Sequence, residues 1–215
     1  MLDLFDDEAG PVVLMWHGAQ TDARSTMRPL AEMVAGYGLT VMVPDWNSHA
    51  DDHGRGDLLR SAEFARQRAE GAGMVLVGWS MGAVAAAGLT IHAEEFNARV
   101  RHTVCLAGAF MAPDPITALP LPVELPAQPA PFTLLHGAGD DVVPAETSRS
   151  FATILNENGW PVEFMELPAD HGAIAGATYD RALDRYSAAD DPQVLAVAAE
   201  VAGRIAAAAG RRSAR

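Results

Sequence analysis

Hydrophobic residues gather in six short runs that are separated by longer stretches of mixed character. The runs contain four or five residues, are rich in valine and leucine, and cover residues 12–15, 39–43, 74–77, 103–106, 132–135 and 162–165. Such runs, with little polar alternation, are typical of strands buried on both faces of a parallel sheet. The pattern between and after them predicts helices over residues 27–37, 57–70, 81–93, 145–158 and 192–209.

The alternation of strand and helix predicts a single three-layer α/β domain over residues 1–215, with a mainly parallel sheet of about six strands. The last helix has clear end signals, because Asp190 or Asp191 can cap it, Pro192 lies in its first turn and Gly210 follows it. About ten residues precede the first predicted strand, so we expect no additional hairpin there. Residues 211–215 form a tail.

Residues 112–131 depart from this alternation, because seven prolines occur among them. Proline lacks an amide donor and has a fixed φ angle, so neither a regular helix nor a central strand is expected here. The segment is either a short lid or pocket wall, or a rigid surface connection. With so little chain available, any lid is minimal or absent.

Composition narrows the functional classes. The chain has 28 acidic and 15 basic residues, a formal net charge of -13, which disfavours nucleic acids and anionic membranes as partners. Every basic residue is arginine, so lysine-based Schiff-base and phosphate-loop chemistry is excluded. The single cysteine, Cys105, lies in an apolar run and is predicted to be a buried, inert thiol.

The N-terminus is acidic where a secretory signal would be basic and then apolar. No apolar stretch approaches the roughly 20 residues that span a bilayer. These features predict a cytoplasmic protein with no membrane partner, and they leave open whether it is a monomer or a homodimer.

The chemistry centres on Gly78-Trp79-Ser80-Met81-Gly82, which lies between the third apolar run and a predicted helix. A serine on a sharp strand-to-helix turn is exposed for nucleophilic attack, and the residues two before and two after it must be very small. We therefore predict that Ser80 is a nucleophile; a purely structural turn is the alternative.

A serine nucleophile needs a histidine base and a carboxylate that orients it. His171 follows the sixth apolar run, so it should lie at the carboxyl edge of the sheet together with Ser80. Asp140 and Asp141 follow the fifth run and reach the same edge, and either could be the acid. The chain order is then Ser, Asp, His.

These residues, with His17-Gly18 and the segment H-G-x-x-D-x-V-V-P at 136–144, resemble the α/β-hydrolase superfamily, most nearly its small carboxylesterase and dienelactone-hydrolase-like branch. The resemblance covers nearly the whole chain, although that fold usually has eight strands. It implies that Asp140, rather than Asp141, is the triad acid. At the nucleophile position of the strand-to-helix turn, this chain has Ser80, whereas dienelactone hydrolases proper have cysteine. The serine favours a reaction in which an acyl group is transferred to water.

Two backbone amides should stabilise the oxyanion. Met81 supplies one because it follows the nucleophile. The resemblance implies that the second comes from the loop after the first run, from Ala19 or, as the alternative, Gln20. The loop lacks the H-G-G-G form of lipases and esterases, and His17, like His136, is predicted to brace its loop.

Three aromatic residues near strand ends, Trp46, Trp79 and Phe110, either line a substrate pocket or pack in the core. A polar cluster at residues 49–57 contains two histidines and three aspartates, but its hydrophilic and glycine-rich setting indicates a surface loop rather than a metal site. We expect neither a metal nor a cofactor.

The sequence thus predicts a serine hydrolase that cleaves small-molecule carboxylic esters through Ser80, His171 and Asp140. A minimal lid favours small, medium or extended acyl groups over long-chain lipids. Two alternatives remain: a thioesterase or acyltransferase that acts on carrier-bound acyl groups, and a non-catalytic binding protein on a hydrolase scaffold.

Overall fold

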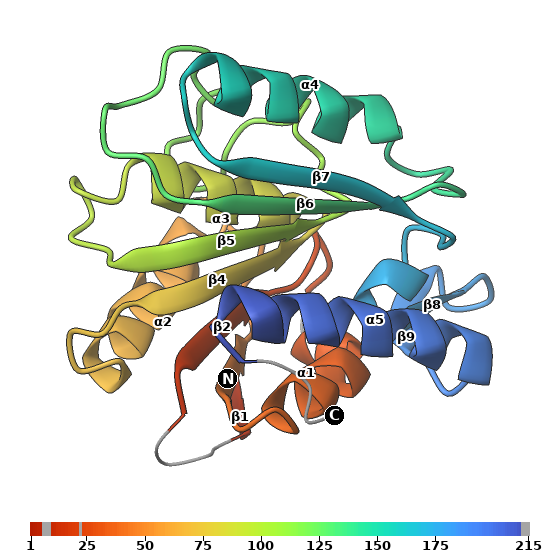
Figure 1. The fold of residues 1–215 in the computed structure, drawn as a ribbon. Coiled ribbons are helices and arrows are strands. Elements are labelled where there is room, and N and C mark those ends of the chain that lie inside the picture. The colour runs from red at the N-terminus through yellow and green to blue at the C-terminus, as the bar shows by residue number, and fades with distance from the viewer. Residues whose placement is uncertain (6–9, 22, 212–215) are drawn as a thin grey trace.

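A mainly parallel sheet forms the centre of the molecule (Figure 1). The computed structural model describes residues 1–5, 10–21 and 23–211, and within them seven strands form one sheet in the order β1-β3-β2-β4-β5-β6-β7. Strands β2 to β7 run parallel, whereas β1 pairs antiparallel with β3. The strands are β1 Leu2–Phe5, β2 Val12–Trp16, β3 Thr40–Pro44, β4 Met74–Trp79, β5 Val100–Leu106, β6 Phe132–Gly137 and β7 Val162–Leu167.

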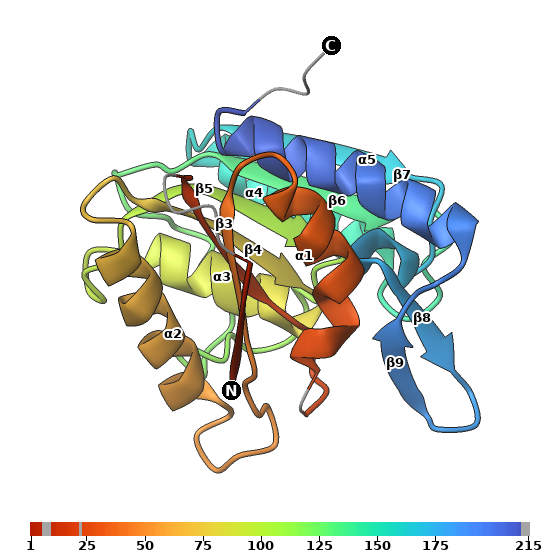
Figure 2. The same cartoon turned by 90° about the horizontal axis from the view of Figure 1, so that it is seen from below.

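Helices cover both faces of this sheet, which confirms the predicted three-layer α/β architecture (Figures 1 and 2). One face packs against α1 and α5, and the other against α2, α3 and α4. The helices are α1 Arg28–Ala35, α2 Arg55–Arg68, α3 Met81–Ile91, α4 Ala145–Glu157 and α5 Pro192–Ala208, with 3₁₀ turns η1 Arg24–Met27 and η2 Ala173–Ala175. The carboxylate of Asp191 caps α5 by accepting from the amides of Gln193 and Val194.

Alternate strand residues point to opposite faces, so the central strands are buried on both sides. Val75 and Val77 of β4 pack toward α1 and α5, whereas Leu76 packs toward α2 and α3. Cys105 lies between α3 and α4 with 1% of its surface exposed, and burial raises the pKa of its thiol. A neutral, enclosed thiol agrees with the inert role predicted for it.

Three features differ from the prediction. Residues Leu2–Phe5 form β1, an added antiparallel edge strand, where we expected none. A separate hairpin, β8 Ala177–Asp180 and β9 Arg185–Ala188, follows η2. Strand β7 is only partly buried because it is the other edge of the sheet. Of the predicted tail, residues 212–215 lie outside the described part of the chain.

The proline-rich segment has neither helix nor strand, as its composition requires. Its second half is a surface connection fixed to the end of α4, where Asn158 Oδ1 accepts from the amide of Leu125 and the Trp160 indole donates to the carbonyl of Pro126. Its first half lies nearer the sheet, where Pro113 and Pro115 line a cavity together with Met81. Both interpretations of this segment therefore hold in part, and no separate lid covers the carboxyl edge within the described residues.

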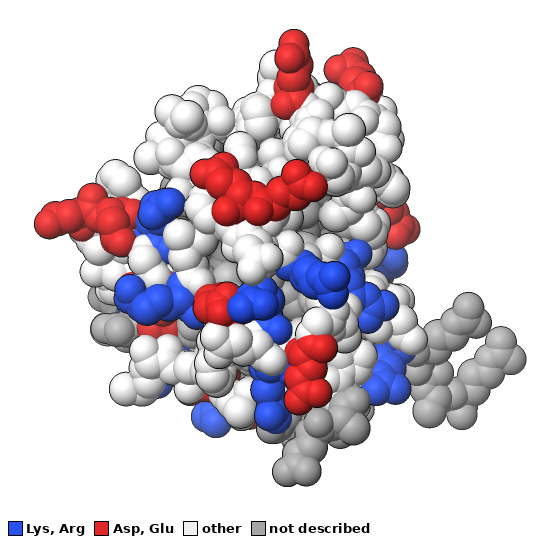
Figure 3. Space-filling model, turned by 90° about the vertical axis from the view of Figure 1, so that its left-hand side faces the viewer, with Lys and Arg blue, Asp and Glu red and all other residues white. Residues whose placement is uncertain are grey.

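The amino ends of the strands form a face rich in arginine despite the acidic composition (Figure 3). A cavity of about 680 Å³ opens there and is lined by Arg68, Arg101 and Arg211 together with Glu70. The residues predicted to carry the chemistry lie at the opposite, carboxyl ends of the strands. No helix in the described ranges has the length and apolar character needed to cross a membrane.

Candidate active site

The turn between β4 and α3 carries Ser80 in a strained backbone conformation. Ser80 has φ 56° and ψ −116°, a region that side chains other than glycine rarely adopt. Its amide donates to the carbonyl of Leu106 at 2.8 Å, and its carbonyl accepts from the amide of Ala109. The neighbouring strand thus fixes the strained turn in place, as a nucleophile elbow requires.

Steric crowding explains why positions 78 and 82 of this turn are glycine. A Cβ atom on Gly78 would overlap the backbone of Gly82, and one on Gly82 would overlap the carbonyl oxygens of Trp16 and His17. The turn therefore packs directly against the end of β2. That close approach brings the loop after β2 next to Ser80.

We expect Gly82→Ala to lower the free energy of unfolding by about 3 kcal/mol, because the added methyl group meets rigid backbone. Urea denaturation of the variant would measure the loss. Gly203→Ala in α5 is the matched control, since its Cβ would meet only the Tyr37 hydroxyl at 3.4 Å. That control should gain about 0.5–1 kcal/mol from helix propensity. A Gly82→Ala variant as stable as wild type would contradict the steric argument.

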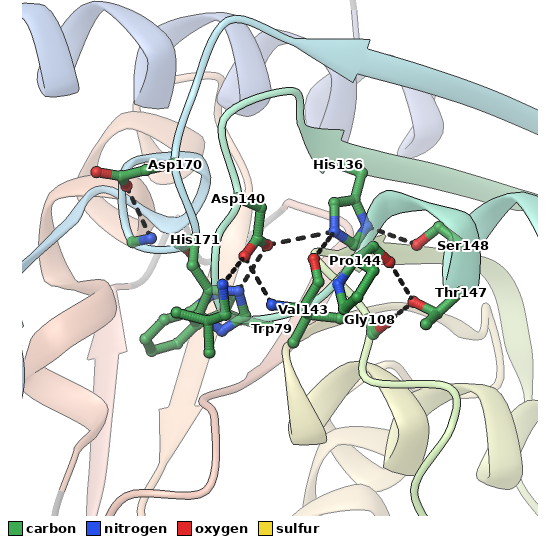
Figure 4. A network of polar contacts seen from close by, with 12 residues as sticks. Trp79, Gly108, His136, Asp140, Val143, Pro144, Thr147, Ser148, Asp170 and His171 are labelled. Carbon is green, nitrogen blue, oxygen red and sulfur yellow. Dashed lines mark hydrogen bonds and ion pairs between the residues drawn. The ribbon is translucent and has the colours of Figure 1, made fainter.

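Asp140 and His171 form a direct hydrogen-bonded pair at the ends of β6 and β7 (Figure 4). His171 Nδ1 lies 2.7 Å from Asp140 Oδ2, and the two side chains are only 4% and 1% exposed. The other carboxylate oxygen accepts from the amides of Val142 and Val143 at 2.9 and 2.8 Å. Asp141 is exposed, so the structure brings Asp140, and not its neighbour, to His171.

A second histidine touches the same carboxylate (Figure 4). His136 Nε2 lies 3.2 Å from Asp140 Oδ2 and 2.9 Å from the carbonyl oxygen of Val143, so this nitrogen carries the proton. The hydroxyl of Ser148 then donates to Nδ1 at 2.7 Å. The bracing role predicted for His136 is confirmed, and sequence reasoning missed its partner Ser148.

The environment holds Asp140 in its charged form. Burial raises the pKa of this carboxyl, but the hydrogen bonds from His136 and His171 and from the Val143 amide outweigh burial. The pKa of Asp140 is therefore well below its usual range. An ionised carboxylate next to Nδ1 fixes the tautomer of His171 and leaves Nε2 free to act as a base.

Trp79 places His171 beside the elbow. Its indole donates to the carbonyl of His171 at 2.8 Å, and the two rings lie 5.5 Å apart (Figure 4). Ser80 is the next residue after Trp79, so the contacts of Trp79 bring the candidate base near the candidate nucleophile. Trp79 itself is 1% exposed, so it packs in the core against His171, which is the second of the two roles predicted for it.

The loop after β2 lies against Ser80. A Cβ atom on Gly18 would be 3.3 Å from the Cβ of Ser80, so a larger side chain here would be tight against Ser80. Trp46 stacks on His17 at 5.6 Å and donates its indole proton to the His17 carbonyl at 3.0 Å. Both residues are buried, and they brace this loop; Trp46 does not reach a substrate cavity.

Cavities flank the site. Phe110 and Met111 line one of about 280 Å³ near α4, and Met81 lines one of about 250 Å³ with Ser48 and Pro113. The position of Phe110 thus fits the predicted substrate contact. In the polar cluster at residues 49–57, the carboxylate of Asp52 accepts hydrogen bonds from the amides of Gly54 and Gly56 and so stabilises the start of α2.

Among the residues that the structure describes, no group of three His, Cys, Asp or Glu side chains is arranged to hold a metal ion. The structure does bring together a serine in a strained turn and a histidine hydrogen-bonded to a buried carboxylate. This fold and this arrangement define an α/β hydrolase of the serine type.

Comparison with protein families agrees with that class. Residues 40–173 match the family model described as serine hydrolase (FSH1), and the chain belongs to this family. The matched range contains Ser80, Asp140 and His171, and it ends before the β8–β9 hairpin. A search of curated proteins found no significant match.

Solved structures of esterases share the fold. Esterase 2 of Thermogutta terrifontis, phosphorylated by paraoxon, superposes with a TM-score of 0.75 at 18% identity over 100% of this chain and 90% of that one. The butyrate-bound form of the same esterase gives 0.73 at 18%, covering 100% and 91%. MGS-M1, an α/β hydrolase from a Medee basin deep-sea metagenome library, gives 0.69 at 17%, covering 95% and 86%. At such identities these likenesses establish the fold alone.

Proposed function

We propose that the protein is a carboxylesterase for small and medium acyl groups. The observation that carries this proposal is the buried Asp140–His171 pair, held by Trp79 beside the strained turn of Ser80. Such a nucleophile, base and orienting acid perform acyl transfer on unrelated folds, so the roles follow from the geometry of the residues and not only from the fold.

In the proposed reaction the Oγ of Ser80 attacks the ester carbonyl carbon while Nε2 of His171 takes the hydroxyl proton. Asp140 stabilises the imidazolium that forms. The carbon–oxygen bond to the alcohol then breaks, and the leaving oxygen takes the proton from Nε2. A water molecule attacks the acyl-enzyme, gives a proton to Nε2, and the released Ser80 oxygen recovers it.

The amides of Met81 and Ala19 are the proposed donors to the oxyanion, each contributing on the order of 100- to 1000-fold in rate. Of the two candidates in the loop after β2, Ala19 is favoured because the amide of Gln20 is already donated to the carbonyl of Gly18 at 2.8 Å. The contact between Gly18 and Ser80 supports this placement.

Two observations support small and medium acyl groups. The cavities near Phe110 and Met81 are about 280 and 250 Å³, below the usual range for a drug-sized ligand. Esterase 2 of Thermogutta terrifontis has been solved with propionate and with butyrate bound. Both observations favour acyl groups that are short enough to bind without a lid domain.

Hydrolysis of nitrophenyl esters from acetate to palmitate tests the substrate class. We expect kcat/KM to be highest near butyrate and at least about tenfold lower for palmitate, because a C16 chain does not fit cavities of about 280 and 250 Å³ without distorting their walls. The butyryl thioester of a small thiol, measured in parallel, separates the esterase from a thioesterase. Equal activity on long-chain esters, or a clear preference for the thioester, would contradict the proposal.

A further inference from the structure

Two hydrogen bonds between Gln20 and Tyr186 attach the β8–β9 hairpin to the loop after β2. The side-chain amide of Gln20 donates to the carbonyl of Tyr186 at 2.9 Å, and its oxygen accepts from the Tyr186 amide at 2.8 Å. One carboxamide thus pairs with both backbone groups of a β9 residue and fixes β9 to the loop after β2. Figure 2 shows the hairpin projecting from the end of the molecule where the strands finish.

A row of aromatic rings leads from His171 along this hairpin. The ring of Tyr186 packs edge-on against Trp79 at 5.0 Å and lies 5.9 Å from the ring of His171. Tyr179 continues the row at 5.1 Å from Tyr186, and its hydroxyl donates to the carboxylate of Asp184. Tyr179 is 44% exposed, so a face of this row is open to a ligand.

A cavity of about 540 Å³ lies against this aromatic row. Its walls come from the hairpin and from the two loops that carry Asp140 and His171, and they include Val142, His171, Thr178, Tyr179 and Tyr186. Two carboxylates, Asp141 and Asp170, and one guanidinium, Arg181, border it, so the lining disfavours an anionic ligand and is compatible with a neutral alcohol. Burial, reinforced by the nearby charge of Asp140, raises the pKa of Tyr186 to about 12, so this ring stays neutral.

The proton transfer from His171 to the leaving group indicates which part of an ester the hairpin cavity would hold. The protonated Nε2 of His171 must reach the oxygen of the departing alcohol, so the alcohol lies on the His171 side of Ser80. The cavities near Met81 and Phe110 do not include His171 among their lining residues. The acyl group then occupies one of those, and the alcohol extends toward the hairpin.

We propose that the hairpin cavity is a leaving-group subsite that takes the aromatic alcohol of an ester, packed against Tyr179 and Tyr186. This inference rests on the proposed esterase function and specifies its substrate class: esters of aryl or arylmethyl alcohols. In the acylation step the bond between the carbonyl carbon and the alcohol oxygen breaks. The aromatic alcohol departs with the proton from Nε2, and the acyl group remains on Ser80.

Benzyl butyrate and cyclohexylmethyl butyrate test the subsite, because they differ in the aromaticity of the alcohol and form the same acyl-enzyme. Their kcat/KM values therefore compare acylation alone. We expect wild type to favour the benzyl ester about tenfold, the range of a well-placed aromatic pair. Tyr179→Leu should reduce this ratio several-fold, because it removes a ring that the benzyl group contacts and leaves an apolar side chain for the cyclohexyl group.

Two further variants separate ring packing from stability. Tyr179→Phe keeps the ring but loses the hydrogen bond to Asp184, so it should retain the benzyl preference. Phe64→Leu on α2 is the matched control, because Phe64 is 47% exposed and lies outside this cavity. A wild-type ratio near one, or an unchanged ratio in Tyr179→Leu, would overturn the subsite while leaving the esterase intact. Failure of wild type to hydrolyse both esters and all nitrophenyl esters would overturn the proposed function as well.

Discussion

Ser80→Ala is expected to lower kcat for nitrophenyl butyrate by about a millionfold, because removing the nucleophile abolishes the acyl-enzyme route. The strained turn should persist, since the backbone hydrogen bond of residue 80 to Leu106 does not involve the side chain. Steady-state hydrolysis, with circular dichroism and thermal unfolding to verify folding, measures the effect.

Ser25→Ala provides the matched control for this result. Ser25 is exposed on η1 and does not line the cavities near Phe110, Met81 or the β8–β9 hairpin. We expect its kcat to stay within about twofold of wild type, as for most surface substitutions. A folded Ser80→Ala protein that retains more than a small fraction of wild-type activity would rule out Ser80 as the nucleophile.

Asp140→Asn is expected to lower kcat by about 10⁴-fold. The asparagine side chain has a similar shape, but it cannot supply a negative charge to the imidazolium, and its amide can hold His171 in the wrong tautomer. Asp141→Asn is the matched control, because Asp141 is adjacent in sequence but exposed. A larger loss in Asp141→Asn than in Asp140→Asn would reverse the assignment of the acid.

The same pair predicts the direction of the pH dependence. Because the pKa of Asp140 is held well below its usual range, this carboxylate stays charged throughout the mildly acidic region. Loss of kcat/KM through protonation of Asp140 should therefore begin only below this region, at a lower pH than an ordinary aspartate would give, and a pH–rate profile measures it.

Local patterns were sufficient to predict the scaffold. Six apolar runs correspond to β2–β7, and the cap at Asp191 and the glycines at positions 78 and 82 have the local roles assigned to them. These features depend on neighbours in sequence, where sterics and hydrogen-bonding geometry can be read directly. Strand β1 was missed because its four residues mix acidic and apolar side chains at a sheet edge.

Contacts between residues far apart in the chain could not be predicted from the sequence. Gln20 and Tyr186 are separated by 166 positions and meet only because the loop after β2 and the hairpin lie at the same sheet edge. The contact of Ser148 with His136 depends likewise on how α4 packs against β6. The residues alone left both Asp140 and Asp141 open and the family resemblance favoured Asp140, whereas the structure shows directly that the Asp140 carboxylate faces His171.

Covalent labelling shows directly whether Ser80 is the nucleophile. A fluorophosphonate probe reacts with an activated serine, and peptide mass spectrometry then locates the adduct. We expect one adduct per chain, on the peptide that contains Ser80, and its loss in Ser80→Ala. A folded wild-type protein that forms no adduct, or that carries the adduct on another residue while Ser80 stays unmodified, would contradict it.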